Sequence, residues 1–254
     1  MWVRAQAGAR VVYGRLTADA GIAVWTDAPW QGGMETEECW APGTYQLLAP
    51  TVPSKIVAVG RNYADHAAEM QATVPVEPVI FLKPPTALLP PGGDIVYPAQ
   101  SRRVDYEGEL ALVIGQTARH LTPTAAVAAI WGYTIANDVT ARDLQKQDGQ
   151  WTRSKGFDTF CPLGPGIVRE LSLEMELQTW LNGERKQAAK LQEMVFKPPV
   201  LVSYISQVMT LLPGDVVLTG TPAGVGPMQP GDKIQIHITG IGTLRNRVVA
   251  QPRL

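Results

Sequence analysis

Several features that define whole classes of protein are scarce in this chain of 254 residues. Its two cysteines, Cys39 and Cys161, lie far apart and without CxxC spacing. That spacing excludes a disulfide framework and a zinc knuckle, and a reducing cytoplasm is the expected location. No stretch approaches the roughly 20 apolar residues that span a bilayer, and the N-terminal segment lacks the continuous apolar core of a signal peptide. We therefore expect neither membrane insertion nor export.

An excess of charge is missing as well. The chain has 22 Lys and Arg residues against 23 Asp and Glu residues, a formal net charge of −1. No dense basic cluster is present to follow a phosphate backbone, and the glycine-rich segment 220–226 lacks the Lys of a P-loop. These absences argue against nucleic acid as a partner. What the chain does have is 45% hydrophobic residues, enough for a large core.

Proline and glycine pairs separate short β-branched runs over most of the chain, a pattern typical of β-rich domains. The expected strands include 56–59, 79–82, 110–114, 216–219 and 234–238, with a hairpin turn at Asn182-Gly183. Helical patterns are fewer and cover 64–70, 123–130 and 199–209. Because helices do not alternate regularly with strands, the pattern disfavours a βα barrel and a dinucleotide-binding sheet. The expected fold class is mainly β, of the α+β type.

The chain divides into two expected parts. Residues 1–50 read as short strands and turns with few candidate catalytic groups, and we interpret them as a small N-terminal β module. The prolines at positions 50 and 53 favour an extended link there. Residues 51–254 then form the catalytic domain.

Three carboxylates are the candidate metal ligands. If residues 104–114 form a strand, its side chains alternate between faces, so Glu107 and Glu109 share one face. Two neighbouring carboxylates on an apolar strand are costly to ionise unless a cation neutralises them. Asp138 directly follows the apolar run 130–137 and is the candidate third ligand. Oxygen ligands favour a hard cation such as Mg²⁺, with Mn²⁺ or Ca²⁺ as alternatives. From spacing alone, the alternative that these are ordinary glutamates on a solvated edge strand remains open.

A helix is expected to follow Asp138, with Thr140 as its N-cap and Asp143 in its first turn. Asp138, Arg142 and Gln145 would then lie on one stripe. Arg142 can bind a substrate carboxylate in bidentate fashion, and Gln145 can hydrogen-bond an adjacent oxygen. A solvated helix face is the alternative.

Lys155 and a histidine–glutamate pair are the remaining candidates. Lys155 precedes a glycine, as in many anion sites, although a surface lysine fits equally well. His66 and Glu69 are three residues apart and share a helical face, so the carboxylate can orient the imidazole as a general base. A surface ion pair is the alternative. His120 and His237 have no comparable partner and are interpreted as structural.

Five ordered motifs closely resemble the fumarylacetoacetate hydrolase family over about residues 51–250, whereas residues 1–50 lie outside the resemblance. The motifs are Gly60-Arg61-Asn62-Tyr63-Ala64-Asp65-His66, Phe81-Leu82-Lys83-Pro84, Asp105-Tyr106-Glu107-Gly108-Glu109-Leu110, Asn137-Asp138-Val139-Thr140-Ala141-Arg142-Asp143 and Leu218-Thr219-Gly220-Thr221-Pro222. The resemblance implies a β-roll or barrel-like fold, a homodimer, and Mg²⁺ or Mn²⁺ bound by Glu107, Glu109 and Asp138.

By motif position the resemblance also implies roles for the surrounding residues. Arg142, Gln145, Lys155 and Thr221 fall where family members bind the carboxylate and keto oxygens of substrate. His66 and Glu69 match a catalytic pair on the mobile lid of the acylpyruvase and oxaloacetate decarboxylase branch.

These roles predict an enzyme that breaks a C–C bond in a small 2-oxo acid bearing a β-carbonyl or β-carboxylate, through a metal-stabilised enolate. The reaction is acylpyruvate hydrolysis or oxaloacetate decarboxylation, with Lys155 and Arg142 holding the substrate's charge. One alternative is an isomerase or tautomerase that acts on oxaloacetate or on enols of the 2-hydroxyhepta-2,4-diene-1,7-dioate type. Another is a non-catalytic binding protein with a vestigial metal site.

Overall fold

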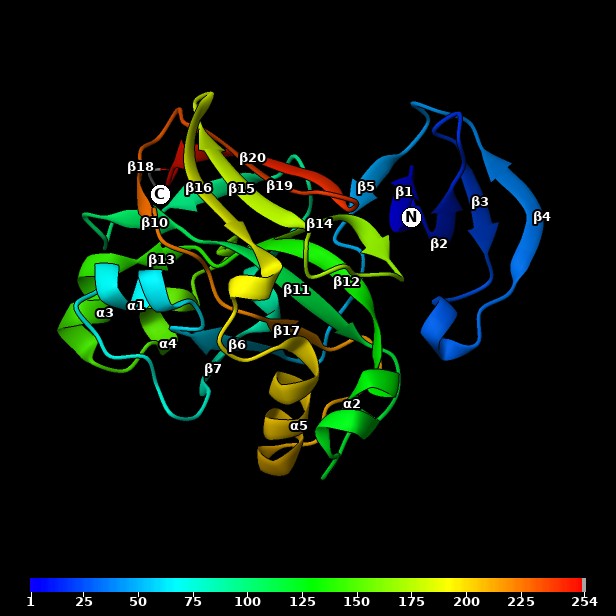
Figure 1. Ribbon diagram of the computed structural model, residues 1–254. Helices are drawn as coiled ribbons and strands as arrows, with labels where there is room; N and C mark the ends of the chain where they lie inside the picture. Colours follow the sequence, from blue (N-terminus) through cyan, green and yellow to red (C-terminus); the bar gives the residue numbers. More distant parts are fainter. Residues whose placement is uncertain (253–254) are drawn as a thin grey trace.

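β-Strands dominate the computed structural model, which describes residues 1–252 and has five α-helices among them (Figure 1). The largest sheet is open and follows the order β4-β3-β2-β1-β14-β12-β11-β17-β6-β7. Its strands outside the N-terminal module are β6 (Ile56–Gly60), β7 (Val79–Lys83), β8 (Leu88–Leu89), β11 (Gly108–Ile114), β12 (Ile130–Asn137), β14 (Cys161–Val168) and β17 (Val216–Leu218). The prediction of a mainly β fold is confirmed.

Two smaller sheets accompany the large one. A three-stranded sheet joins β10 (Val104–Tyr106), β13 (Thr140–Ala141) and β18 (Gly226–Met228). A five-stranded sheet joins β9 (Asp94–Tyr97), β15 (Glu176–Leu181), β16 (Glu184–Lys190), β19 (Lys233–Ile238) and β20 (Gly242–Ala250). The turn between β15 and β16 is the predicted Asn182-Gly183, with positive φ at both residues.

Residues 2–48 hold β1 (Trp2–Ala7), β2 (Arg10–Leu16), β3 (Ile22–Trp25), β4 (Glu35–Trp40) and β5 (Gln46–Leu48). These strands enclose a hydrophobic cluster of their own around Ile22 and Val24. They still belong to the large sheet, because β1 pairs with β14 at Trp2↔Ile167 (Figure 1). Edge-to-face contacts of Trp2 and Trp30 with Trp131 strengthen this junction. The division of the chain at residue 50 stays a prediction.

The helices form two groups (Figure 1). α2 (Pro123–Ala129) and α5 (Pro198–Val208) pack against each other, and each begins with proline, whose fixed φ suits a first helical position. The second group consists of α1 (Ala64–Glu69), α3 (Arg142–Asp148) and α4 (Thr152–Lys155), which lie at the end of the molecule opposite the N-terminal strands. Within residues 1–252, no helix has the length and hydrophobicity needed to cross a membrane.

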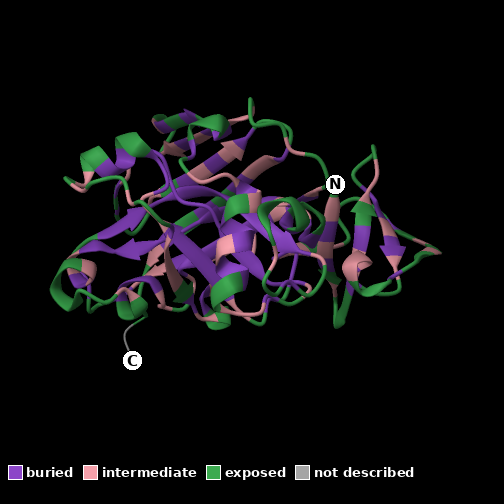
Figure 2. Cartoon of the chain, turned by 60° about the horizontal axis from the view of Figure 1, so that its bottom comes forward, coloured by how far each residue is buried: buried purple, intermediate pink, exposed green. Residues whose placement is uncertain are grey.

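β11 shows the expected alternation of side chains. Leu110, Leu112 and Ile114 are buried in the main core, which also contains residues of α2, α5 and the five-stranded sheet. Ala111 points to the opposite face, into a smaller cluster with Ala136. The central strands are buried on both faces (Figure 2). Any charged group on them must therefore find its partner inside the protein.

Candidate metal centre

The antiparallel pairing of β11 with β12 brings the three predicted carboxylates together. In this register Gly108 lies opposite Asn137, so Asp138 comes next to Glu107, and the Asp138 N–H donates to the Glu107 carbonyl at 2.8 Å. Each of Glu107, Glu109 and Asp138 offers a carboxylate oxygen within 4.8 Å of the other two, and all three residues are at most 5% exposed. The sheet register therefore builds a buried acidic cluster.

The strand expected over 104–114 is interrupted at Glu107. Val104–Tyr106 pair with β13 and β18, whereas Gly108–Ile114 pair with β12 and β17. The Glu107 N–H takes no part in the strand pairing of either sheet and instead donates to Asn137 Oδ1 at 2.9 Å. A single continuous strand was thus wrong, because the chain passes here from one sheet to another.

The two glutamates differ in their tendency to ionise. Burial alone would raise the pKa of Glu107, but the charges of Lys155 and Arg142 hold it well below its usual value. Burial, followed by the charges of Asp138 and Glu107, raises the pKa of Glu109 well above its usual value. The Gly220 N–H donates to Glu109 Oε2 at 2.6 Å. The charged form of Glu109 is therefore costly in this site unless a cation lies beside it, and otherwise the protonated form is favoured.

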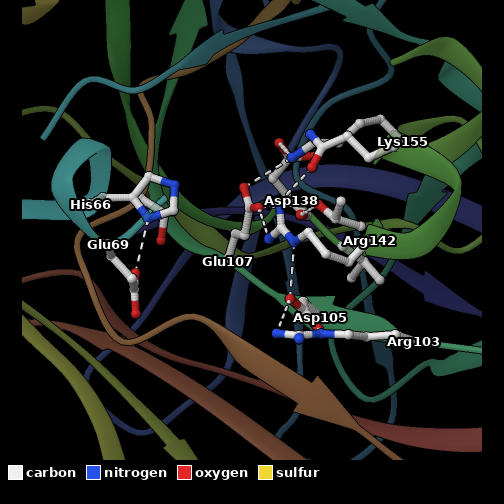
Figure 3. A network of polar contacts seen from close by, with 12 residues as sticks. His66, Glu69, Arg103, Asp105, Glu107, Asp138, Arg142 and Lys155 are labelled. Carbon is white, nitrogen blue, oxygen red and sulfur yellow. Dashed lines mark hydrogen bonds and ion pairs between the residues drawn. The ribbon is translucent and has the colours of Figure 1, made fainter. Parts of the chain in front are cut away.

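Two lysines converge on Asp138, and Figure 3 shows one of them, Lys155. Lys155 Nζ donates to Asp138 Oδ2 at 2.6 Å and to Glu107 Oε2 at 2.9 Å. Lys83 Nζ lies 2.7 Å from Asp138 Oδ1 and donates to the carbonyls of Lys155 and Val139. Lys83 is fully buried, and no role was assigned to it from the sequence. Its signals were its place at the end of an apolar strand and within the motif Phe81-Leu82-Lys83-Pro84.

Arg142 is held by acidic groups of the chain itself. Its guanidinium donates to Asp105 Oδ2 at 2.9 Å and to Glu107 Oε1 at 2.5 Å (Figure 3). It also donates to Gln145 Oε1 at 2.7 Å. Asp105 also accepts hydrogen bonds from Arg103. Arg142 and Gln145 thus share a helical face as expected, and both also line the cavity described below.

Two local expectations after Asp138 were wrong. The N-cap of α3 is Ala141 rather than Thr140, and Asp138 precedes the helix, so it is not part of the stripe of Arg142 and Gln145. Thr140 Oγ1 instead lies 2.9 Å from the Asp138 carbonyl and 3.2 Å from Glu107 Oε1. The hydroxyl supports the acidic cluster in place of a helix end.

The predicted pair of His66 and Glu69 forms on α1. His66 Nδ1 lies 3.2 Å from Glu69 Oε2, and the Gly224 N–H donates to both oxygens of Glu69. His66 is 6% exposed, which is far from the solvated ion pair that spacing left open. Figure 3 shows His66 on the other side of Glu107 from Lys155.

The predicted site residues other than Glu69 line one cavity of about 240 Å³. Its residues are Val59, Gly60, Arg61, His66, Met70, Phe81, Glu107, Glu109, Asp138, Arg142, Gln145, Lys146, Trp151, Lys155 and Thr221. Phe81 and Trp151 form an apolar wall, with ring centroids 5.0 Å apart. Thr221 Oγ1 donates to the Gly108 carbonyl and accepts from Gln187 Nε2. The cavity is below the usual range for drug-sized ligands and suits a small metabolite.

The donor set fits a hard divalent cation. Glu107, Glu109 and Asp138 supply only oxygens, and Asp138 Oδ1 accepts no aligned hydrogen bond despite its contact with Lys83. Burial, followed by the charges of Asp138 and Glu107, raises the pKa of Glu109, so a cation beside it would favour its charged form. Such all-oxygen sites suit Mg²⁺ or Mn²⁺ better than thiophilic metals.

Gly108 has no side chain, which lets Thr179 and Gln187 approach its backbone closely. We predict that Gly108→Ala lowers the free energy of unfolding by about 1–3 kcal/mol through overpacking. A Cβ there would lie 2.4 Å from Thr179 Oγ1 and 3.1 Å from Gln187 Oε1. Because both neighbours sit on paired strands, Glu107 and Glu109 must shift, and cation affinity should fall about tenfold. Urea denaturation and Mn²⁺ titration measure both effects.

Gly183→Ala is the matched control. Gly183 has φ of 87° and open space around its Cα, so alanine strains the turn and leaves the acidic cluster untouched. Unchanged Mn²⁺ affinity in Gly108→Ala would contradict the prediction.

The chain is similar in sequence to known families and to individual proteins. The family profile described as fumarylacetoacetate (FAA) hydrolase C-terminal matches residues 55–249, and a profile described as Rv2993c-like, N-terminal, matches residues 1–50. Protein Rv2993c of Mycobacterium tuberculosis is 53% identical over 84% of this chain and 82% of its own. Oxaloacetate tautomerase FAHD2B, mitochondrial, of Bos taurus is 44% identical over 80% of this chain and 69% of its own.

Two solved structures are informative. 5-carboxymethyl-2-hydroxymuconate delta-isomerase from Mycobacterium smegmatis superposes with a TM-score of 0.93 at 44% identity, covering 98% of this chain and 99% of that one. Fumarylpyruvate hydrolase from Pseudomonas aeruginosa, solved with Mn²⁺ and pyruvate, gives a TM-score of 0.74 at 33% identity, covering 81% and 92%. The similar proteins therefore include isomerases, a tautomerase and a hydrolase.

Proposed function

The chain belongs to the fumarylacetoacetate hydrolase family, and from this premise we propose that it interconverts the keto and enol forms of a small 2-oxo diacid of the oxaloacetate type. The observation that carries the proposal is the placement of Lys155 and His66 around one buried carboxylate cluster in one small cavity, with Glu69 bonded to His66. A fixed positive charge and a base are thus available to the same ligand. The relatives named as a tautomerase and an isomerase support this choice.

Glu107, Glu109 and Asp138 would hold the cation, which we propose to be Mg²⁺ with Mn²⁺ able to replace it. When bound, it supplies electrophilic polarisation of the substrate's carboxylate and 2-oxo oxygens.

The protein's own groups move the protons. His66, oriented by Glu69, accepts a proton from C3 of the keto form. Burial would lower the pKa of Lys155, but Asp138 and Glu107 raise it, so the ammonium stays charged and can stabilise the negative charge that develops on the 2-oxo oxygen. His66 then returns the proton to the 2-oxo oxygen, which balances the conversion and regenerates the base. Arg142, Gln145 and Thr221 line the cavity where they can position the substrate's oxygens.

Cleavage of a C–C bond is the second candidate, favoured by the buried His66 and its partner Glu69, which can equally activate a water molecule. Attack of that water on the C4 carbonyl would release pyruvate from an acylpyruvate, and oxaloacetate would lose CO₂ without added water. The relative named as a fumarylpyruvate hydrolase supports this alternative.

An assay of the purified protein with Mg²⁺ separates the two reactions. Ultraviolet absorbance follows the enol of oxaloacetate, and a coupled assay follows pyruvate, with oxaloacetate and acetylpyruvate as substrates. The proposal expects rapid equilibration of enol and keto forms without pyruvate. Pyruvate formed at the rate of substrate loss would establish cleavage instead, and the absence of both reactions would reject the proposal.

His66→Gln tests the assigned base. The variant should lower kcat for tautomerisation by about 10²-fold or more, since a positioned acid–base group contributes 10²- to 10⁴-fold, while Mn²⁺ affinity stays within about twofold. His237→Gln is the control, because His237 bonds Thr243 on the five-stranded sheet. A fully active His66→Gln would remove His66 from the mechanism.

We also propose a homodimer located in the cytoplasm, although the bovine relative is named as mitochondrial. Light scattering of the purified chain tests the dimer, and cell fractionation tests the location.

A further inference from the structure

Two basic residues of the cavity lack an acidic partner. Four Arg and Lys residues line it, and of these Arg142 and Lys155 are engaged with Glu107. Within residues 1–252, neither Arg61 nor Lys146 forms an ion pair. Both are therefore available to a ligand.

Arg61 adopts a backbone conformation that favours other residues. Its φ is 59°, in the left-handed region, where a residue other than glycine or asparagine costs about 1–3 kcal/mol. The conformation is held by its neighbour Asn62, which is fully buried and donates to the carbonyls of Phe196 and Thr219. Glycine would meet the backbone requirement at lower cost. The use of arginine here therefore lies in its side chain, which lines the cavity.

The charges around the acidic cluster point to the kind of ligand. Four carboxylates, on Asp105, Glu107, Glu109 and Asp138, face five cations, which are the buried Lys83, Arg142 and Lys155 and the cavity residues Arg61 and Lys146, a balance of 5 − 4 = +1. A divalent cation raises the sum to +3. A dianionic substrate compensates more of this positive charge than a monocarboxylate does.

We propose that Arg61 and Lys146 bind the distal carboxylate of a dianionic 2-oxo acid and so select diacids over monoacids. The proposal rests on the proposed function and adds to it the residues that recognise the far end of the substrate. The guanidinium of Arg61 offers a bidentate fork for a carboxylate, and Lys146 contributes a mobile charge from α3.

The test compares oxaloacetate with pyruvate, which is the same acid without its distal carboxylate. Arg61→Met, Lys146→Met and the double variant are assayed for the KM of oxaloacetate and for the Ki of pyruvate as a competitive inhibitor. Each single variant should raise KM about tenfold, as expected for loss of a charge-assisted hydrogen bond, with the pyruvate Ki unchanged within about twofold. Arg61→Lys, which keeps the charge but not the bidentate fork, should recover only part of the loss. Lys233→Met, at an exposed lysine outside the cavity, should change nothing.

Equal increases in KM and Ki, or no change in KM, would overturn the assignment of Arg61 and Lys146. A parent protein that fails to turn over oxaloacetate rejects the proposed function separately. In that case calorimetric titration of the same variants with oxaloacetate and pyruvate decides the selectivity from binding alone.

Discussion

Glu109→Gln should lower kcat/KM by about 10³-fold or more and should remove the thermal stabilisation that Mg²⁺ gives the parent protein. The glutamine keeps the volume of the side chain and removes its charge, so one of the three candidate ligands becomes a weak neutral donor. Activity against oxaloacetate and the melting temperature with and without Mg²⁺ measure the two effects. Glu37→Gln, at an exposed position of β4, is the matched control.

The same variant should be at least as stable as the parent in the absence of metal. The pKa of Glu109 is raised in the folded chain by burial and by Asp138 and Glu107. Its contribution to stability is therefore full below the usual pKa of 4.5 and is lost as the pH rises above that value toward the raised pKa. Glu107, whose pKa is lowered, acts in the opposite sense below pH 4.5.

Urea denaturation in EDTA should consequently show a free energy of unfolding that declines above pH 4.5 in the parent and declines less in Glu109→Gln. A variant that is less stable than the parent without metal, or that keeps its Mg²⁺ stabilisation, would contradict the assignment of Glu109 as a ligand.

Lys155→Met should reduce kcat by about 10³-fold, since a positioned charge of this kind contributes 10²- to 10³-fold to turnover. The change also leaves Glu107 and Asp138 without the ammonium that each contacts within 2.9 Å. Removal of one partner of a buried ion pair typically costs about 3–5 kcal/mol. Measured by urea denaturation, that loss should be large in EDTA and smaller with Mg²⁺, because a cation neutralises the same carboxylates.

Lys155→Arg separates charge from position. Arginine retains the positive charge, so most of the stability should return, but its planar fork cannot reproduce the position of Nζ and activity should stay low. Full activity in Lys155→Met would exclude Lys155 from the chemistry.

Alternation along an assumed continuous strand predicted that Glu107 and Glu109 share a face. Their carboxylate oxygens do lie within 4.8 Å of each other, although Glu107 falls between two strands. The interruption at Glu107 depends on which strands pair with each half of the segment, and the partners β12 and β18 come from distant parts of the chain. Local patterns carry no information on such pairing. For the same reason the nearness of Asp138 rested on the family resemblance.

Lys83 and Thr140 show the other limit of sequence reasoning. Lys83 meets the carbonyls of Val139 and Lys155, which are 56 and 72 residues away. A lysine at a strand end usually keeps its ammonium in water, so only the fold identifies this one as an internal counter-ion. Threonine is a residue type that often caps helices, but Thr140 instead hydrogen-bonds a buried carbonyl and a carboxylate of the acidic cluster.

The pairing of β1 with β14 has a consequence for attempts to dissect the chain. A β-strand that loses its neighbour presents unpaired backbone N–H and C=O groups, a template for association with another chain. Residues 1–50 thus cover the edge of β14, whose unpaired backbone groups could otherwise pair with a strand of another molecule. A fragment beginning at residue 51 retains every residue proposed for chemistry, yet we expect it to aggregate through β14 before its activity can be measured.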